Sequence, residues 1–237
     1  MFFRLHPDVL RRFPGLYVGF VVVVGARNGA SPDAARLLAE AVEVLRRELG
    51  EVSSVREHPR IAVWRGAMQE AGINPNRFPN SIEALASRVA KGGSPPSINA
   101  AVDLANAAAL RHVVPVGCHD LGAMSGDLEV RPSRQGDVFT PMGAQEAEPV
   151  DPGEIVYADA AEVRTRRWIW RQGERAKATP ASTWLFFPVD GLSPVSREAA
   201  ERARDWLAEQ APRILGGRVH VGWVDRHRPE APLPGDR

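Results

Sequence analysis

The sequence predicts a mixed α/β fold of the α+β type, in which mixed β-sheets are flanked by helices. Three observations indicate this class. A continuous apolar, β-branched run covers residues 16–25, as is typical of a strand buried on both faces. Apolar residues at helical spacing follow in 31–50. From residue 128 onward, short β-prone segments alternate with Gly and Pro turns.

The composition favours an ordinary globular chain with a real core. It has 237 residues, of which 44% are hydrophobic and 25% charged. A net charge of +1 excludes a strongly basic, histone-like binder, so any nucleic-acid contact has to come from a local patch. The single cysteine, Cys118, excludes an intramolecular disulfide framework and a cysteine-based zinc site.

No signal peptide and no membrane span are expected. Arg4 and Asp8 interrupt the apolar N-terminus, and the apolar run around 20–24 is too short to cross a bilayer. We therefore expect a cytoplasmic protein without a membrane partner.

The first half of the chain is expected to be mainly helical after its opening strand. Ser31 and Pro32 form a helix start, with an N-cap serine and a proline at the first helical position. Ser81 is the expected N-cap of a later helix, and residues 113–117 are expected to form a short strand or a turn. The expected helices cover 31–50, 58–71, 81–93 and the alanine-rich stretch after Pro96.

The second half is expected to hold most of the strands, a helix from Ser193-Pro194 to Gly216, and a frayed end at 229–237. We expect one domain over 1–228, with an N-terminal portion at 1–57, a central region at 58–190 and a C-terminal helix and strand at 191–228. The expected strands cover 128–131, 138–143, 153–157, 183–189 and 218–225.

The stretch 164–190 concentrates the unusual chemistry. Trp168 and Trp170 are two apart, which on a strand places both rings on one face. A Pro-containing turn and an apolar segment follow, so we expect a hairpin-like unit with a cationic tip. Such a unit could be a solvated, charged edge strand or a site for phosphates and stackable rings. Its cations are Arg164, Arg166, Arg167, Arg171, Arg175 and Lys177, opposed within the run by Glu174.

Polar residues on the alanine-rich helix form a second candidate. Asp103 and Asn106 are three apart and share one side. If buried they need partners, so they either line a site or tie down neighbouring loops. Cys118, His119 and Asp120 cannot form a triad among themselves, because adjacent residues on an extended chain alternate faces.

Cys118 is expected to be a small buried hydrophobe rather than a nucleophile. His119 is either a general base or a structural histidine. The six histidines show no spacing typical of metal ligands, and no glycine-rich phosphate motif occurs. Neither a metal nor a cofactor is expected.

The region from about His58 to Asp190 resembles the B3/B4 tRNA-binding (editing) domain of the phenylalanyl-tRNA synthetase beta chain. It is most similar to free-standing proteins made of that domain alone. The matching pieces occur in the same order as in the family. They are WRGAM, SIEALASRVAKGG, SINAAVDLAN, PVGCHD and WRQGERAKATPAST. Nothing in the chain resembles the aminoacylation machinery, so no aminoacylation activity is expected.

The resemblance implies a B3/B4-like fold and an editing pocket. In the synthetase, this domain hydrolyses tyrosine wrongly attached to the phenylalanine tRNA. By motif, Asn106 matches the asparagine that ends a helix, and Asp120 matches the family aspartate. Gly117 stands at the family histidine, and Ala105 at a threonine. Arg171-Gln172-Gly173-Glu174 replaces a glutamate-bearing loop, and His119 is expected to face the side opposite to residue 117.

The resemblance further implies a free-standing protein that binds the acceptor end of tRNA and deacylates mischarged aminoacyl-tRNA in trans. The expected catalytic-site residues are Asn106, Asp120 and Glu174. The expected RNA-binding residues are Arg167, Arg171, Gln172, Arg175 and Lys177. The alternative is a non-catalytic binder of tRNA or of a small amino-acid-like ligand, which the missing family histidine favours.

Overall fold

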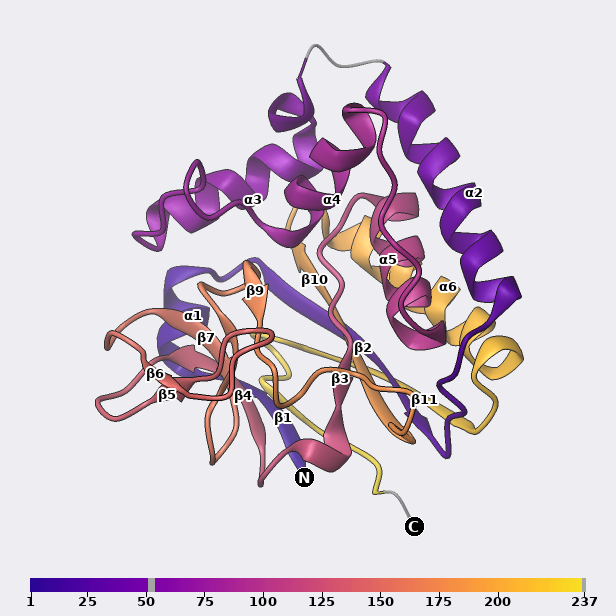
Figure 1. Ribbon diagram of the computed structural model, residues 1–237. Coiled ribbons are helices and arrows are strands. Elements are labelled where there is room, and N and C mark those ends of the chain that lie inside the picture. Colours follow the sequence, from indigo (N-terminus) through magenta and orange to yellow (C-terminus); the bar gives the residue numbers. More distant parts are fainter. Residues whose placement is uncertain (51–53, 236–237) are drawn as a thin grey trace.

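The structure is a computed structural model that describes residues 1–50 and 54–235, and two β-sheets form its centre (Figure 1). The six-stranded sheet has the order β12 (Glu230–Pro232), β1 (Phe2–Leu5), β4 (Leu128–Pro132), β7 (Ile155–Ala158), β8 (Val163–Arg166) and β9 (Arg171–Gln172). The four-stranded sheet has the order β11 (Arg218–Asp225), β2 (Leu16–Val24), β10 (Trp184–Leu192) and β3 (His119–Asp120). A small ribbon pairs β5 (Val138–Phe139) with β6 (Glu148–Pro149).

Helices complete the predicted mixed α/β class. The first sheet is mixed, because β1 and β4 are parallel and its other pairs are antiparallel. Helices gather on one side of the four-stranded sheet, and the six-stranded sheet lies on the other side (Figure 1). These are α2 (Pro32–Leu49), α3 (Pro59–Glu70), α4 (Ser81–Ala90), α5 (Ala100–His112) and α6 (Arg197–Ile214). The short α1 (Pro7–Arg12) precedes β2.

Strand β2 is the central strand that its apolar run predicts. All nine of its residues are buried, and it pairs antiparallel with both β10 and β11. Its side chains alternate between two cores. Val18, Phe20 and Val22 belong to the core shared with the six-stranded sheet, whereas Val21 and Val23 pack against the helices.

Helix α2 begins as the sequence predicts, with the Ser31 hydroxyl accepting a hydrogen bond of 3.2 Å from the Ala34 N–H. For α4 the predicted cap is wrong by one residue. The Asn80 side chain caps the helix by accepting from the Glu83 N–H at 2.8 Å, and Ser81 is the first helical residue. Asparagine and serine cap almost equally well, so composition alone cannot distinguish the two neighbours.

The segment 113–117, for which a short strand or a turn is expected, holds a turn at Val113 and a single bridge between Val116 and Val189. The start of the last helix differs from expectation. The last helix begins at Arg197, after a turn that contains Ser193. In this turn the Ser196 hydroxyl accepts a hydrogen bond of 2.9 Å from the Leu192 N–H, which ties the turn to the end of β10.

The expected flexible tail is wrong for residues 230–235. Strand β12 pairs antiparallel with β1, and Ala231 and Leu233 are buried. The Leu233 N–H also donates a hydrogen bond of 3.0 Å to the Met1 carbonyl oxygen. A Pro-rich segment can pair at a sheet edge, where its missing N–H groups leave no ladder bond unmade. Residues 236–237 lie outside the described residues.

The expected hairpin over 164–190 is also wrong. Strands β8 and β9 pair with each other, whereas β10 belongs to the other sheet. Arg167 and Trp168 have left-handed backbone angles, with φ of 48° and 63°, so the two tryptophans do not share a strand face. Trp168 is fully buried, with ring centroids 4.6 Å from Phe13 and 5.3 Å from Trp64.

Asp103 ties down the entry to α5. It is fully buried, accepts a hydrogen bond of 2.8 Å from the Ile98 N–H and accepts another from the Ser97 hydroxyl. The loop-tying alternative therefore describes this residue. We expect Asp103→Ala to lower the free energy of unfolding by about 2 kcal/mol, because both donors lose their acceptor.

Urea unfolding would measure that change. Asp103→Asn is the matched control, since it keeps an acceptor for one donor and should lose about half as much. An unchanged urea midpoint in Asp103→Ala would contradict this role.

Candidate functional site

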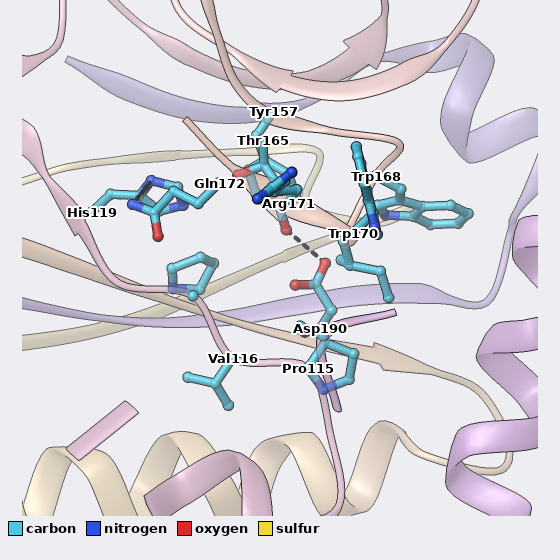
Figure 2. Close-up of a pocket in the computed structure, with 14 residues that line it drawn as sticks. Pro115, Val116, His119, Tyr157, Thr165, Trp168, Trp170, Arg171, Gln172 and Asp190 are labelled. Carbon is cyan, nitrogen blue, oxygen red and sulfur yellow. Dashed lines mark hydrogen bonds between the residues drawn. The ribbon is translucent and has the colours of Figure 1, made fainter. Parts of the chain in front are cut away.

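A pocket opens where the two sheets meet (Figure 2), with a cavity volume of about 100 Å³. One wall comes from the segment after α5, and the other from the six-stranded sheet and the turn that follows β8. The structure thus brings 115–119 and 165–172 face to face, although about fifty residues separate them in the chain. The lining residues that carry the argument below are Gly117, His119, Tyr157, Trp168, Arg171 and Asp190.

A buried hydrogen bond crosses between the sheets inside the pocket. The Tyr157 hydroxyl on β7 donates to Asp190 Oδ1 on β10 at 2.6 Å (Figure 2). Burial raises the pKa of Asp190 to about 7, although the Tyr157 hydrogen bond opposes that rise. Burial also raises the pKa of Tyr157 well above its usual range. A carboxyl group that is half protonated near neutral pH can both accept and donate hydrogen bonds to a ligand.

Sequence reasoning did not assign Tyr157 or Asp190 to the site. The one available signal was a carboxylate inside the otherwise apolar strand 184–192, because a buried acid needs a partner. Nothing in the sequence identifies Tyr157 as that partner, since the two residues are 33 positions apart.

His119 lines the same pocket and is neutral. It is only 2% exposed, and its ring stacks on Tyr157 with centroids 6.4 Å apart and planes 21° apart. Burial, and then the positive charge of Arg164, lower its pKa to about 4. An imidazole with that pKa carries no charge at physiological pH.

The expectation that His119 faces away from residue 117 is wrong. A Cβ added at Gly117 would lie 3.3 Å from His119 Nε2 and 3.0 Å from Pro188 Cγ. Residues two apart on an extended chain share one face, so both positions border the cavity. Both distances are shorter than ordinary van der Waals contact, so a histidine at position 117 would require Pro188 and His119 to shift. The His119 ring approaches the space that such a side chain would need.

The Gln172 side chain joins the segments that form one edge of the pocket. Its side-chain Nε2 donates to the carbonyl oxygens of Cys118 at 2.7 Å and Ala176 at 3.0 Å, and lies 3.2 Å from His119 Nδ1. Gln172, which is expected to contact RNA, thus uses its amide nitrogen for contacts within the protein.

Cations and aromatic rings surround the mouth of the pocket. The Arg171 side chain lines the pocket, is exposed, and forms no ion pair with any described residue. Its guanidinium lies 5.7 Å from the Trp170 ring centroid. The Arg167 guanidinium lies 3.8 Å from the Phe78 ring and 4.8 Å from the Trp170 ring. We call Phe78, Arg167, Trp170 and Arg171 the rim cluster.

Two of the six cations counted in the stretch are neutralised inside the protein. Arg164 is buried and pairs with Asp159 at 2.6 Å and Glu162 at 2.8 Å. Arg166 is buried likewise, and pairs with Glu148 at 2.7 Å and Glu154 at 3.0 Å. The local patch is therefore less positive than the residue run alone indicates.

The remaining expected RNA-binding residues and Glu174 lie outside the pocket lining. The Arg175 side chain is 60% exposed, with its Nε 3.8 Å from Glu162 Oε2. Lys177 pairs with Glu174, which also accepts a hydrogen bond of 2.8 Å from the Gly143 N–H. The Lys177 hydrogen bond, followed by the Gly143 one, lowers the pKa of Glu174. Glu174 thus joins two loops beside the pocket.

Asn106 and Asp120 are likewise not among the lining residues. Asn106 is half-buried on α5. Asp120 accepts hydrogen bonds of 2.5 Å from the Ser182 hydroxyl and 2.8 Å from the Gly122 N–H, so its carboxylate organises the loops around β3.

Cys118 is buried, and burial raises the pKa of its thiol. The thiolate that nucleophilic chemistry requires is therefore disfavoured. Within residues 1–50 and 54–235, no group of three metal-ligating side chains comes together. In the same part of the chain, no helix has the length and apolar character needed to cross a bilayer.

Residues 63–209 match the B3/4 domain family. This match covers more than half of the chain and contains every residue that lines the pocket. The chain belongs to the B3/4 domain family. The resemblance seen in its motifs is thereby confirmed, and the pocket described above is the pocket of a B3/4 domain.

Among solved structures, an N-terminal fragment of the phenylalanyl-tRNA synthetase beta-subunit from Pyrococcus horikoshii is similar to this B3/4 domain protein. The similarity covers 92% of this chain at 13% sequence identity and a TM-score of 0.47. The chain spans 49% of that fragment, or about half of its length. No curated protein matches the chain.

Proposed function

We propose that this B3/4 domain hydrolyses a mischarged amino acid from the acceptor end of tRNA, acting in trans. One observation carries the proposal. A small pocket that contains the hydrogen-bonded pair Tyr157 and Asp190 lies within the residues that match the family. The exposed Arg171, which has no ion pair with any described residue, lies at the mouth of this pocket.

The size of the pocket indicates which part of the substrate would enter it. Sites for drug-sized ligands usually measure about 300–1,000 Å³. A cavity of about 100 Å³ fits a group of a few heavy atoms, such as an amino-acid moiety, and not a whole nucleotide. The terminal nucleotide and its phosphates would therefore lie outside, on the rim.

The rim cluster suits those outer parts. The exposed Arg171 guanidinium can form bidentate hydrogen bonds with a phosphate, and the half-buried Trp170 ring offers a stacking surface for the terminal base. Arg167, Arg175 and Lys177 would add positive charge around this contact. Gln172 would support the site from within, because its amide holds the wall at 118–119.

The expected catalytic-site residues would act as supports. Asp120 and Glu174 hold the loops on either side of the pocket through Ser182 and Gly143. Asn106 is proposed on its motif position alone.

The reaction needs no protein nucleophile. Water attacks the ester carbonyl carbon, the carbon–oxygen bond to the ribose breaks, and the proton from water ends on the released ribose oxygen. The products are a free amino acid and a tRNA with its terminal hydroxyl restored. Hydrogen-bond donors that face the developing oxyanion lower the barrier of such a step, and the neighbouring ribose hydroxyl can relay the proton.

A second function is a non-catalytic binder of tRNA or of a small amino-acid-like ligand. The observation that favours it is that Asp190 and Arg171 both line the pocket, Asp190 buried and Arg171 exposed at the mouth. A carboxyl and a guanidinium across one small cavity complement the ammonium and the carboxylate of a free amino acid.

Incubating the purified protein with a panel of mischarged aminoacyl-tRNAs tests the proposal. We expect at least one of them to lose its amino acid faster than the protein-free blank. No release above the blank across the panel would overturn the hydrolase. Salt-dependent tRNA binding without release would instead support the binder.

Arg171→Ala should weaken tRNA binding about tenfold and lower the salt slope of binding by about 1, as expected for one lost phosphate contact. Arg213→Ala on α6 is the matched control, since its side chain is 67% exposed and lies outside the pocket lining. Equal behaviour of the two variants would remove Arg171 from the tRNA contact.

A further inference from the structure

We propose that His119 acts as a neutral hydrogen-bond donor to the carbonyl oxygen of the bound aminoacyl group, with its proton held on Nε2 by Gln172. The identity of the acceptor rests on the function proposed above. The position of the proton does not, because it follows from contacts within the protein.

The orientation of the Gln172 amide is the first step. One end of this amide lies 2.7 Å from the Cys118 carbonyl oxygen and 3.0 Å from the Ala176 carbonyl oxygen. A carbonyl oxygen only accepts hydrogen bonds. The end of the amide that faces two such oxygens must therefore be the NH₂ group, since the amide oxygen would be repelled by both.

This orientation decides the tautomer of His119. The Gln172 nitrogen lies 3.2 Å from His119 Nδ1. A proton on Nδ1 would point at a group that has only hydrogens to offer. The amide has two hydrogens for three neighbouring acceptors, the two carbonyl oxygens and Nδ1, so it offers no acceptor to a proton on Nδ1. Nδ1 is therefore the unprotonated nitrogen, and a neutral ring must carry its proton on Nε2.

The surroundings keep the ring neutral. His119 lies between aromatic rings, with centroids 6.4 Å from both Tyr157 and Phe186. Arg164 is the charged group whose field disfavours a second proton, and it adds to the effect of burial that lowers the pKa to about 4. Tyr157 and Asp190 are titratable groups that also line the pocket, and the two are hydrogen-bonded to each other. A ring with so low a pKa is a poor general base at neutral pH.

The Nε2–H faces the cavity. His119 lines the pocket, and among the described residues none accepts a hydrogen bond from Nε2. Gly117 contributes to this access, because even a methyl group there would lie 3.3 Å from Nε2. An unused donor that faces the cavity fits a ligand that presents an oxygen acceptor.

Nitrogen-15 NMR of the free protein tests the proton position without any assay of activity. We expect His119 to show the shifts of a protonated Nε2 and a bare Nδ1, unchanged from pH 8 down to about pH 5. A protonated Nδ1, or a titration near the usual pKa of histidine, would overturn the inference.

Two substitutions then separate a donor from a base. Glutamine can place its amide N–H near the position of Nε2, whereas asparagine reaches only the position of Nδ1, and neither can act as a base. We expect His119→Gln to deacylate within a few-fold of the wild-type rate, and His119→Asn to lose about 100-fold, the usual effect of removing one oxyanion donor. Equal losses in both would overturn the donor role. Thermal unfolding curves of the two variants establish that both are folded.

A non-hydrolysable aminoacyl-adenosine amide keeps the two proposals distinguishable. If the wild-type protein binds this probe but releases no amino acid from tRNA, the hydrolase fails, and the donor role is judged by whether His119→Asn weakens binding more than His119→Gln. If the wild-type protein neither binds the probe nor deacylates tRNA, both the proposed function and the assigned acceptor are wrong.

Discussion

Trp168→Ala is expected to lower the free energy of unfolding by about 4 kcal/mol, which is typical for removing a large buried aromatic side chain. The indole is fully buried and packs against Phe13 and Trp64, with ring centroids at 4.6 and 5.3 Å. These partners come from the N-terminal segment and from α3, so the indole joins three parts of the chain. Its removal leaves a cavity that none of the three can fill alone.

Urea unfolding followed by far-UV circular dichroism measures this effect. Trp170→Ala is the control, because Trp170 is half-buried and its ring packs mainly against Phe78 at 4.9 Å. It should cost about 1–2 kcal/mol. Similar losses in the two variants would show that Trp168 does not hold the core as described.

Asp190→Asn is expected to change how stability depends on pH. The pKa of Asp190 is about 7 in the folded protein, against 3.8 for the unperturbed group. The folded state therefore binds more protons than the unfolded state between these values, and stability falls as the pH rises through this window. The shift of about 3 units corresponds to about 4 kcal/mol. This contribution is fully present below pH 3.8 and is lost above pH 7.

The asparagine variant keeps an oxygen for the Tyr157 hydroxyl but cannot ionise. We expect it to unfold at the same urea concentration as a protonated wild type at low pH, and to become the more stable protein by up to about 4 kcal/mol at pH 8. The quantity to compare at each pH is the difference in the free energy of unfolding between the variant and the wild type. This difference cancels the contribution of His112 and His119, whose pKa values are both lowered to about 4 and whose effect on the pH dependence of stability has the opposite sign.

Asp205→Asn serves as the control, because its side chain is 63% exposed and should produce no such trend. A constant stability difference between Asp190→Asn and wild type from pH 4 to pH 8 would contradict the raised pKa. The same titration bears on the pocket, since a ligand that binds near neutral pH would meet a carboxyl group close to its midpoint.

Much of the framework followed from local patterns. The apolar run of β2, the capped helix α2 and the alternating strand β11 lie where periodicity and turn residues predicted. Cys118 is in the core, as expected. Such features can be derived locally, because they depend on spacing along the chain and on burial.

The wrong predictions for 167–170 and for the segment from residue 230 share one cause, which is that contacts with distant parts of the chain hold both segments in place. The turn at 167–170 breaks an expected strand, because Arg167 and Trp168 adopt left-handed angles. The packing of the Trp168 ring and the hydrogen bonds of the two N–H groups to Glu154 and Ile155 support this turn. The Pro-rich end from residue 230 pairs with β1, a contact between the two ends of the chain. Neither feature has a signal within its own few residues.

The charge of the candidate site shows the same division. The sequence alone established the family motifs, the excess of arginine in 164–177 and the missing side chain at position 117. Tertiary structure alone decided that Arg164 and Arg166 are neutralised, that Arg171 is free of ion pairs with the described residues, and that Tyr157 meets Asp190. Charge, protonation and access depend on which distant groups lie within a few ångströms, and the sequence does not encode those distances locally.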